Sequence, residues 1–154
     1  MADEHERLVL GPEQLGHALR MLAACALAYI VSWLFRLPEV YWSLVTVVIV
    51  THPDLPSTVT AGRDRIIGTL IGAAVGALAI LGREHGLPTL PLYVVGLVPL
   101  VLLTAASQSL RLSCITFTIV LLAPAAGSSF ALPMIRVIEI VIGTLAALLI
   151  SLVR

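Results

Sequence analysis

Two arginines occupy matching positions near the starts of two long apolar segments. Arg65 stands three residues before Gly68, and Arg136 stands three residues before Glu139. A charge at the head of a packed helix face points toward protein or a cavity, where it needs an acid, a carbonyl or an anionic ligand as its partner. We therefore predict that Arg65 and Arg136 each face such a partner, with an anionic substrate as one of the possibilities. The alternative is that both side chains snorkel to lipid headgroups.

Two other side chains are candidates for proton coupling. Glu139 is the acid placed deepest within an apolar segment. A carboxylate inside a membrane is costly unless it is paired or protonated, so Glu139 is either a static partner of Arg136 or a proton carrier. His52 follows an apolar run and can titrate near neutral pH, and its alternative is an inert histidine at the interface.

Small residues follow a regular spacing behind the first of these arginines. Gly68, Gly72 and Gly76 recur every four residues, and Gly143 holds the corresponding place behind Arg136. Glycines at this spacing remove side-chain bulk from one helix face and let another backbone come close. We predict that these four glycines make a tight helix contact, within one chain or between two copies.

The composition indicates that these residues lie on membrane-spanning helices. Of 154 residues, 59% are hydrophobic and 12% are charged, with a mean hydropathy of +1.06. Soluble domains carry roughly a quarter charged residues, so a soluble enzyme is excluded as the default. The apolar runs do not alternate as barrel strands do, and a span takes about 20 residues. The sequence predicts one all-α integral membrane domain over 1–154 with six transmembrane helices, at about 17–36, 40–52, 58–82, 89–107, 111–123 and 132–153.

The second and fifth segments are short, and each runs into a proline. Sliding the chain on itself by 71 residues superposes four pairs: Pro53 on Pro124, Ser57 on Ser128, Arg65 on Arg136 and Gly72 on Gly143. This match predicts two three-helix repeats, about 15–86 and 87–154. Because three is odd, the second copy enters the membrane from the opposite side, so the repeats are inverted, as in many transporters. The alternative is a chance match between helices of similar composition.

The basic residues are all arginines, and they are scattered singly. This distribution does not fit a nucleic-acid partner. Six of the nine fall on one side of the predicted spans if the amino terminus is inside, so the positive-inside rule predicts cytoplasmic termini. The four histidines are too far apart to suggest a metal site, and no nucleophile or phosphate-binding motif is visible. We therefore expect no metal, no cofactor and no enzymatic activity.

The stretch 41–78 carries a more specific pattern. An aromatic pair opens a short helix that contains a threonine, a proline follows, and then an arginine precedes a Gly-Thr pair and a glycine-spaced helix. The residues in this pattern are Tyr41, Trp42, Thr46, Pro53, Arg65, Gly68, Thr69, Gly72 and Gly76. The pattern resembles that of the fusaric acid resistance and aromatic acid exporter proteins, and more distantly the plant aluminium-activated malate transporters.

This resemblance implies a six-helix domain of the bacterial inner membrane that takes part in efflux of aromatic carboxylic acids. Because a guanidinium is a planar fork that fits a carboxylate, it also implies that Arg65 and Arg136 bind the carboxylate of the substrate. It further implies substrate-binding roles for Tyr41, Trp42 and Thr46 as walls of a cavity, although the two aromatic rings could instead be interface anchors. Most members of the family carry a further soluble domain or a second membrane half, so we expect a homodimer in the lipid bilayer, with a soluble partner protein as a further possibility.

The sequence thus predicts a membrane protein that exports organic anions, most specifically aromatic carboxylic acids. Two alternatives remain open at this point. One is a passive anion channel, and the other is a non-transporting membrane subunit that needs a soluble partner. A membrane enzyme ranks last, because no convergent catalytic set is visible.

Overall fold

The structure is a computed structural model that describes residues 11–106, 110–122 and 131–153. Within these ranges its secondary structure is helical, which confirms the predicted all-α class and the six helical segments. The helices are α1 (Pro12–Leu34), α2 (Tyr41–Val50), α3 (Leu55–Glu84), α4 (Thr89–Ala106), α5 (Arg111–Leu122) and α6 (Ala131–Leu152).

Two helices begin earlier than the apolar runs predict, α1 at Pro12 and α3 at Leu55. The side chain of Asp54 caps α3, because it accepts a hydrogen bond from the backbone N–H of Ser57 at 2.8 Å. Both helices also carry a proline in their first turn, where its missing N–H costs nothing. Apolar runs mark the part of a helix that is suited to lipid, whereas caps and prolines mark its start.

The helices differ in length. By length and composition, α1, α3 and most of α6 can cross a membrane, whereas α2, α4 and α5 are shorter apolar helices. The expected short second and fifth segments are α2, with 10 residues, and α5, with 12 residues. Of the residues that the repeat superposes, Pro53 lies in the chain between α2 and α3. Pro124 and Ser128 lie outside the described residues.

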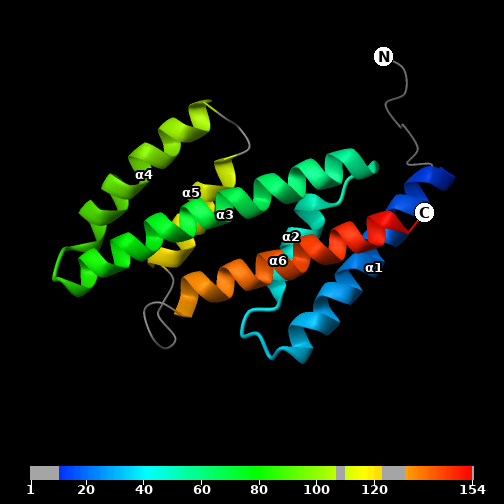
Figure 1. Cartoon of the computed structure of the whole chain (residues 1–154), viewed down its shortest axis with the longest axis horizontal. Coiled ribbons are helices and arrows are strands. Elements are labelled where there is room, and N and C mark those ends of the chain that lie inside the picture. The colour runs from blue at the N-terminus through cyan, green and yellow to red at the C-terminus, as the bar shows by residue number, and fades with distance from the viewer. Residues whose placement is uncertain (1–10, 107–109, 123–130, 154) are drawn as a thin grey trace, which may run out of the picture.

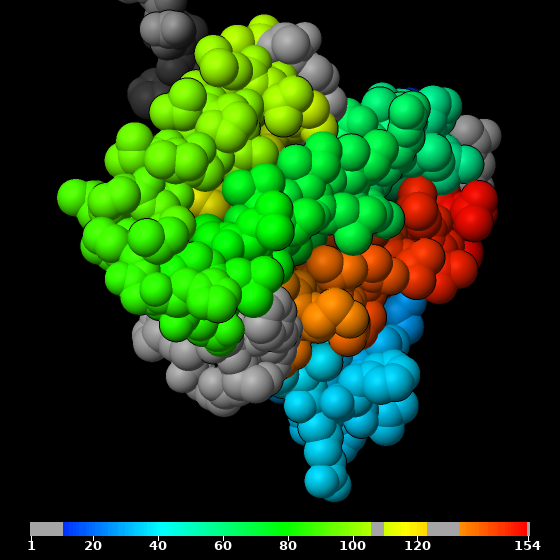
Figure 2. Space-filling model, turned by 60° about the vertical axis from the view of Figure 1, so that its left-hand side comes forward, coloured from blue at the N-terminus to red at the C-terminus, as the bar shows by residue number. Residues whose placement is uncertain are grey.

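Helices α3 and α6 lie side by side at the centre and run in opposite directions (Figure 1). The short helix α5 packs on α3, and the short helix α2 packs on α6. On the outside, α1 contacts α6 and α2, and α4 contacts α3 and α5. Figure 2 shows α4 and the carboxyl-terminal half of α3 next to each other on one face, with α6 beside α3. The start of α1 and the end of α6 lie on the same side of the molecule (Figure 1).

The closest helix contacts form at two glycines. A Cβ atom at Gly72 would collide with the backbone oxygen of Ser113 on α5, and one at Gly143 would collide with the backbone oxygen of Ser43 on α2. Each glycine also faces a threonine side chain one turn further along the partner helix, Thr116 and Thr46 respectively. The backbones can therefore approach this closely only where a side chain is absent.

The other two glycines of the predicted face also lie against α5. A Cβ at Gly68 would lie 3.3 Å from the backbone nitrogen of Ser113, and one at Gly76 would lie 2.5 Å from the Cγ1 of Val120. Gly68, Gly72 and Gly76 therefore form one continuous contact between α3 and α5 within a single chain.

Gly72→Ala and Gly143→Ala should each lower the free energy of unfolding by about 1–3 kcal/mol, because the added methyl group overpacks a backbone contact. Thermal unfolding in detergent micelles, followed by circular dichroism, measures the change. Gly16→Ala is the matched control, since nothing lies within 4 Å of a Cβ there. We expect that control to be neutral or stabilising, by up to about 1 kcal/mol. Equal stability of Gly72→Ala and Gly16→Ala would contradict the close contact.

Candidate functional site

Arg136 is the centre of a largely buried cluster of charged side chains, and it is itself only 4% exposed. Its Nη2 donates to Oε2 of Glu39, and its Nη1 donates to Oε2 of Glu139 at 3.0 Å. Glu139 is fully buried. The guanidinium also lies over the Trp42 ring, with Cζ 4.8 Å from the ring centroid, a cation–π distance. One cation is thus held by two carboxylates and an aromatic face. We call Arg136, Glu39, Glu139, Tyr41 and Trp42 the Arg136 cluster.

Three elements assemble the Arg136 cluster. Arg136 and Glu139 are three residues apart on α6 and share one face. Glu39 lies in the segment before α2, and Trp42 lies in the first turn of α2. The close approach of α2 to α6 at Gly143 brings these groups together. The sequence left two roles open for Glu139, a static partner of Arg136 or a proton carrier. In the structure Glu139 is paired with Arg136.

Glu39 is a member of the site that the sequence analysis missed. Its Oε2 also accepts hydrogen bonds from the Tyr41 hydroxyl and from Trp42 Nε1, the latter at 2.9 Å. Burial raises the pKa of Glu39, but hydrogen bonds from Tyr41 and Arg136, the charge of Arg136 and the bond from Trp42 together lower its pKa below the ordinary value. Glu39 is therefore ionised at neutral pH. One feature of the sequence could have identified Glu39. It is an acid just before a helix that begins with two aromatic residues, and a helix amino terminus favours negative charge.

Arg65 has a different environment from its counterpart Arg136. It is 2% exposed, and its backbone oxygen accepts a hydrogen bond from Thr69 Oγ1 at 2.7 Å. Its Nε is buried without a hydrogen-bond partner. Among the residues that the structure describes, no carboxylate forms an ion pair with Arg65, and the ion pairs found there all involve Arg136. Arg65 is therefore a buried cation that lacks a described counter-ion.

The contact between the two central helices fixes how far apart the arginines lie. A Cβ at Gly62 of α3 would lie 2.8 Å from Cγ2 of Thr144 on α6, so these two positions face each other. Arg65 follows Gly62 by three residues, and Arg136 precedes Thr144 by eight. Because the helices are antiparallel (Figure 1), both arginines lie on the same side of this contact, within about one and a half turns of each other along the pair.

The three predicted wall residues occupy two environments. Tyr41 is 53% exposed, with its ring centroid 5.4 Å from that of Trp42, and both rings belong to the Arg136 cluster. Thr46 is fully buried, donates to the backbone oxygen of Trp42 at 2.9 Å and packs against Gly143. Thr46 therefore lies in the contact between α2 and α6.

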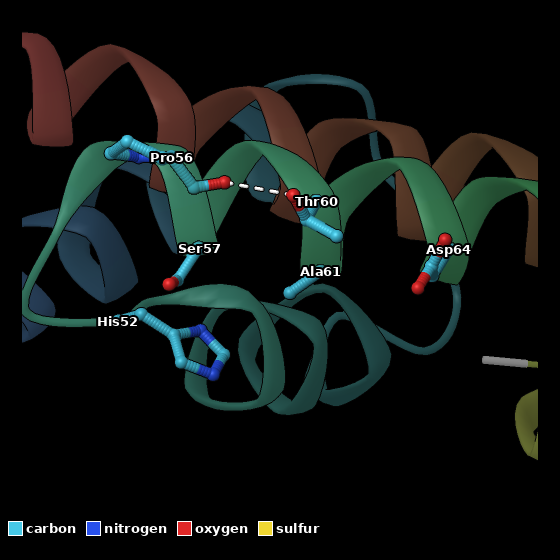
Figure 3. A pocket seen from close by; sticks show the side chains of 6 residues that line it. All are labelled: His52, Pro56, Ser57, Thr60, Ala61 and Asp64. Atoms are coloured by element: carbon cyan, nitrogen blue, oxygen red, sulfur yellow. Dashed lines mark hydrogen bonds between the residues drawn. The ribbon is translucent and has the colours of Figure 1, made fainter. Parts of the chain in front are cut away.

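His52 lies away from the Arg136 cluster. It follows α2, and its ring Nδ1 is 2.9 Å from the backbone oxygen of Val50. Figure 3 shows its imidazole beside the first turns of α3, where it lines an open pocket of about 430 Å³ with Pro56, Ser57, Thr60, Ala61 and Asp64. The Arg136 cluster is at the other end of α2, a ten-residue helix about 15 Å long. The structure does not bring His52 and Glu139 together.

Comparison with known proteins shows the family of this chain. Residues 27–150 match the family described as fusaric acid resistance protein-like. The chain belongs to this family. Over 75 residues, 49% of the chain and 11% of the relative, it is 32% identical to a protein named "Uncharacterized transporter YdhK" from Escherichia coli strain K12. Over 62 residues, 40% of the chain and 9% of the relative, it is 37% identical to an uncharacterized protein of Haemophilus influenzae. The matched part is thus about a tenth of these relatives' length, and the resemblance to the family is confirmed.

Arg136→Gln should lower the free energy of unfolding by about 3 kcal/mol at neutral pH, because it leaves the two acidic side chains without their cation. The folded-state pKa of Glu39 lies below its unfolded value. Its pairing therefore stabilises the protein above the unfolded pKa, and this contribution is lost as the pH falls through the folded pKa. We expect the wild type to lose stability in acid, and Arg136→Gln to lose less.

The measurement is unfolding in detergent over a series of pH values. Arg111→Gln, which changes an exposed arginine at the start of α5, is the control and should follow the wild type. Parallel pH curves for the wild type and Arg136→Gln would show that the Arg136 cluster contributes no such pairing.

Proposed function

We propose that this chain is the membrane part of a transport protein that exports organic anions, with aromatic carboxylates as the substrate class. The observation that carries the proposal is the burial of Arg65 without a described counter-ion. A buried guanidinium is costly when it is alone, and a carboxylate can satisfy it with two parallel hydrogen bonds. Membership of the fusaric acid resistance protein-like family and the transporter name of one relative support a membrane transport role.

Arg65 is the better substrate ligand of the two arginines. Arg136 already contacts Glu39 and Glu139, so a substrate carboxylate would have to displace one of them. We propose that Arg136 shapes the site, while Arg65 binds the carboxylate. Tyr41 and Trp42 lie beside Arg136, which is on the α6 side of the α3–α6 pair. We propose that a substrate ring contacts these two aromatic faces when the helices move.

The packing of the helices supports the proposed inverted repeats, about 15–86 and 87–154. Exchanging α1 with α4, α2 with α5 and α3 with α6 converts every helix contact into another contact that is present. The two closest glycine contacts, at Gly72 and Gly143, are converted into each other. In transporters built from inverted repeats, the substrate site lies at the interface of the repeats. Here that interface is the α3–α6 pair with its two arginines.

Further parts of the proposal concern topology and assembly. With three helices in each repeat, both termini lie on the same side, which we assign to the cytoplasm of a bacterium from the arginine distribution. The chain is proposed to work in the inner membrane as a homodimer, with a soluble partner protein as an additional component. Because Arg65 is only 2% exposed, we assign the structure to a closed state and propose that α3 moves before a substrate enters.

Arg65→Ala should reduce the flux of a radiolabelled aromatic carboxylate into proteoliposomes about tenfold or more, because it removes charge-assisted hydrogen bonds to the substrate. The matched control is Arg63→Ala, which removes an exposed arginine from the same helix. Circular dichroism checks that both variants are folded. Equal flux in Arg65→Ala and Arg63→Ala would remove Arg65 from the substrate site.

The same assay distinguishes the mechanisms. Accumulation against a gradient that requires an imposed pH gradient supports a proton-coupled exporter. Downhill anion current in a planar bilayer, with no effect of a pH gradient, would replace export by passive conduction. Absence of both activities in the wild type would contradict transport by this chain alone.

A further inference from the structure

The Arg136 cluster contains more acidic than basic side chains. Glu39 and Glu139 are two carboxylates, and Arg136 is the one cation that forms an ion pair with either of them among the described residues. If both acids were ionised, the cluster would carry a surplus negative charge in a largely buried place. When two acids share one cation in a medium of low dielectric constant, binding a proton on one of them removes the surplus negative charge.

The geometry distinguishes the two acids. Glu139 is fully buried, and its Oε1 has no hydrogen-bond partner. The Glu39 side chain is 30% exposed, and one of its oxygens accepts from Tyr41, Trp42 and Arg136. An oxygen that is buried without a donor is much less costly on a neutral carboxyl group than on a carboxylate. The proton therefore belongs on Glu139, and Glu39 connects the cluster to water.

The elements packed against α6 provide little else that could compensate Glu139. Helix α1 buries only Ala24, Ala28 and Ser32, which do not titrate. Helix α2 contributes Tyr41 to the cluster, and α3 carries Arg65, which forms no ion pair with the described acids. Arg111 at the start of α5 is exposed. Within the described part of the chain, Arg136 and Glu39 are the charged groups in contact with this site.

We propose that Glu39 and Glu139 form a proton-binding pair held by Arg136, with one proton bound on Glu139 in the closed state. On release, the O–H bond of Glu139 breaks, the proton passes to the Glu39 carboxylate and then to water at its exposed edge. Two ionised acids then compete for Arg136, which weakens the contact between α2 and α6. The coupling of this step to anion export rests on the proposed function, whereas proton binding itself does not.

The experiment uses the full chain in proteoliposomes and two readouts that need no substrate. The infrared carbonyl band of a protonated carboxyl group reports the proton directly. The fluorescence of Trp42 reports the cluster in a Trp33→Phe background, because its indole donates to Glu39 and lies under Arg136. Both signals are followed from about pH 5 to about pH 9. Glu139→Gln and Glu39→Gln are the test variants, and Glu84→Gln, at an exposed acid of α3, is the control.

We expect the wild type and Glu84→Gln to show a protonated carboxyl group that titrates together with the Trp42 signal. Each test variant leaves one acid opposite one arginine, so both should lose this titration. The absence of a titrating carboxyl group in the wild type, or its persistence in both Glu139→Gln and Glu39→Gln, would overturn the proposal. Because two variants are used, a folding defect in one leaves the other as a test.

Flux measurements on the same vesicles separate this proposal from the proposed function. Glu139→Gln should lose accumulation driven by a pH gradient and retain downhill flux. A titrating pair in a wild type that moves no carboxylate supports the proton site and contradicts the transport function. Wild-type flux without any titrating carboxyl group supports transport and contradicts the proton site.

Discussion

The approach of two backbones at Gly72 and at Gly143 is the contact on which the rest of the structure depends. Each glycine lies against the backbone of a short helix, α5 for Gly72 and α2 for Gly143. With a side chain at either position, the short helix could not lie this close to its long partner. With a side chain at Gly143, the first turn of α2 would lie too far from α6 for Glu39 to reach Arg136. Close packing of small residues thus comes first, and the charged cluster follows from it.

The two matching arginines have different surroundings in spite of their matching places. Arg136 has two acids and an aromatic ring as partners, and Arg65 has no described acid. The proposed inverted repeats would place the two arginines in similar positions, and the side chains around each arginine make the two positions different. The proposed transport function uses this asymmetry, because it assigns the anion and the coupling proton to separate binding groups. In this account Arg65 binds the anion, and the Arg136 cluster binds the proton.

Much of the fold could be predicted from the sequence. The six helical segments follow from apolar runs and their breaks, since burial of long apolar stretches in helices is the main constraint on such a chain. The helix starts at Pro12 and Leu55 were missed, because caps and first-turn prolines lie outside the apolar runs. Among the described residues, three helices have the length and composition of a membrane span, so six transmembrane helices stay a prediction.

The candidate site was less predictable than the fold. Arg136 and Glu139 are neighbours on one helix face, so their pairing is visible in the spacing. Glu39 is 97 residues from Arg136, and only the packing of α2 on α6 brings the two together. His52 was a reasonable proton-coupling candidate by residue type, but α2 separates it from the cluster. Spacing along a sequence predicts contacts within a helix, whereas contacts between helices depend on packing geometry.

The claim that Arg65 recognises a carboxylate is tested most directly by equilibrium binding of radiolabelled benzoate to the purified protein. Unlabelled benzoate and benzamide serve as competitors, because they share a ring and differ in charge. We predict saturable binding that benzoate displaces, that benzamide does not displace, and that Arg65→Ala abolishes. Displacement by benzamide as effective as that by benzoate, or unchanged binding in Arg65→Ala, would contradict a site built around this buried arginine.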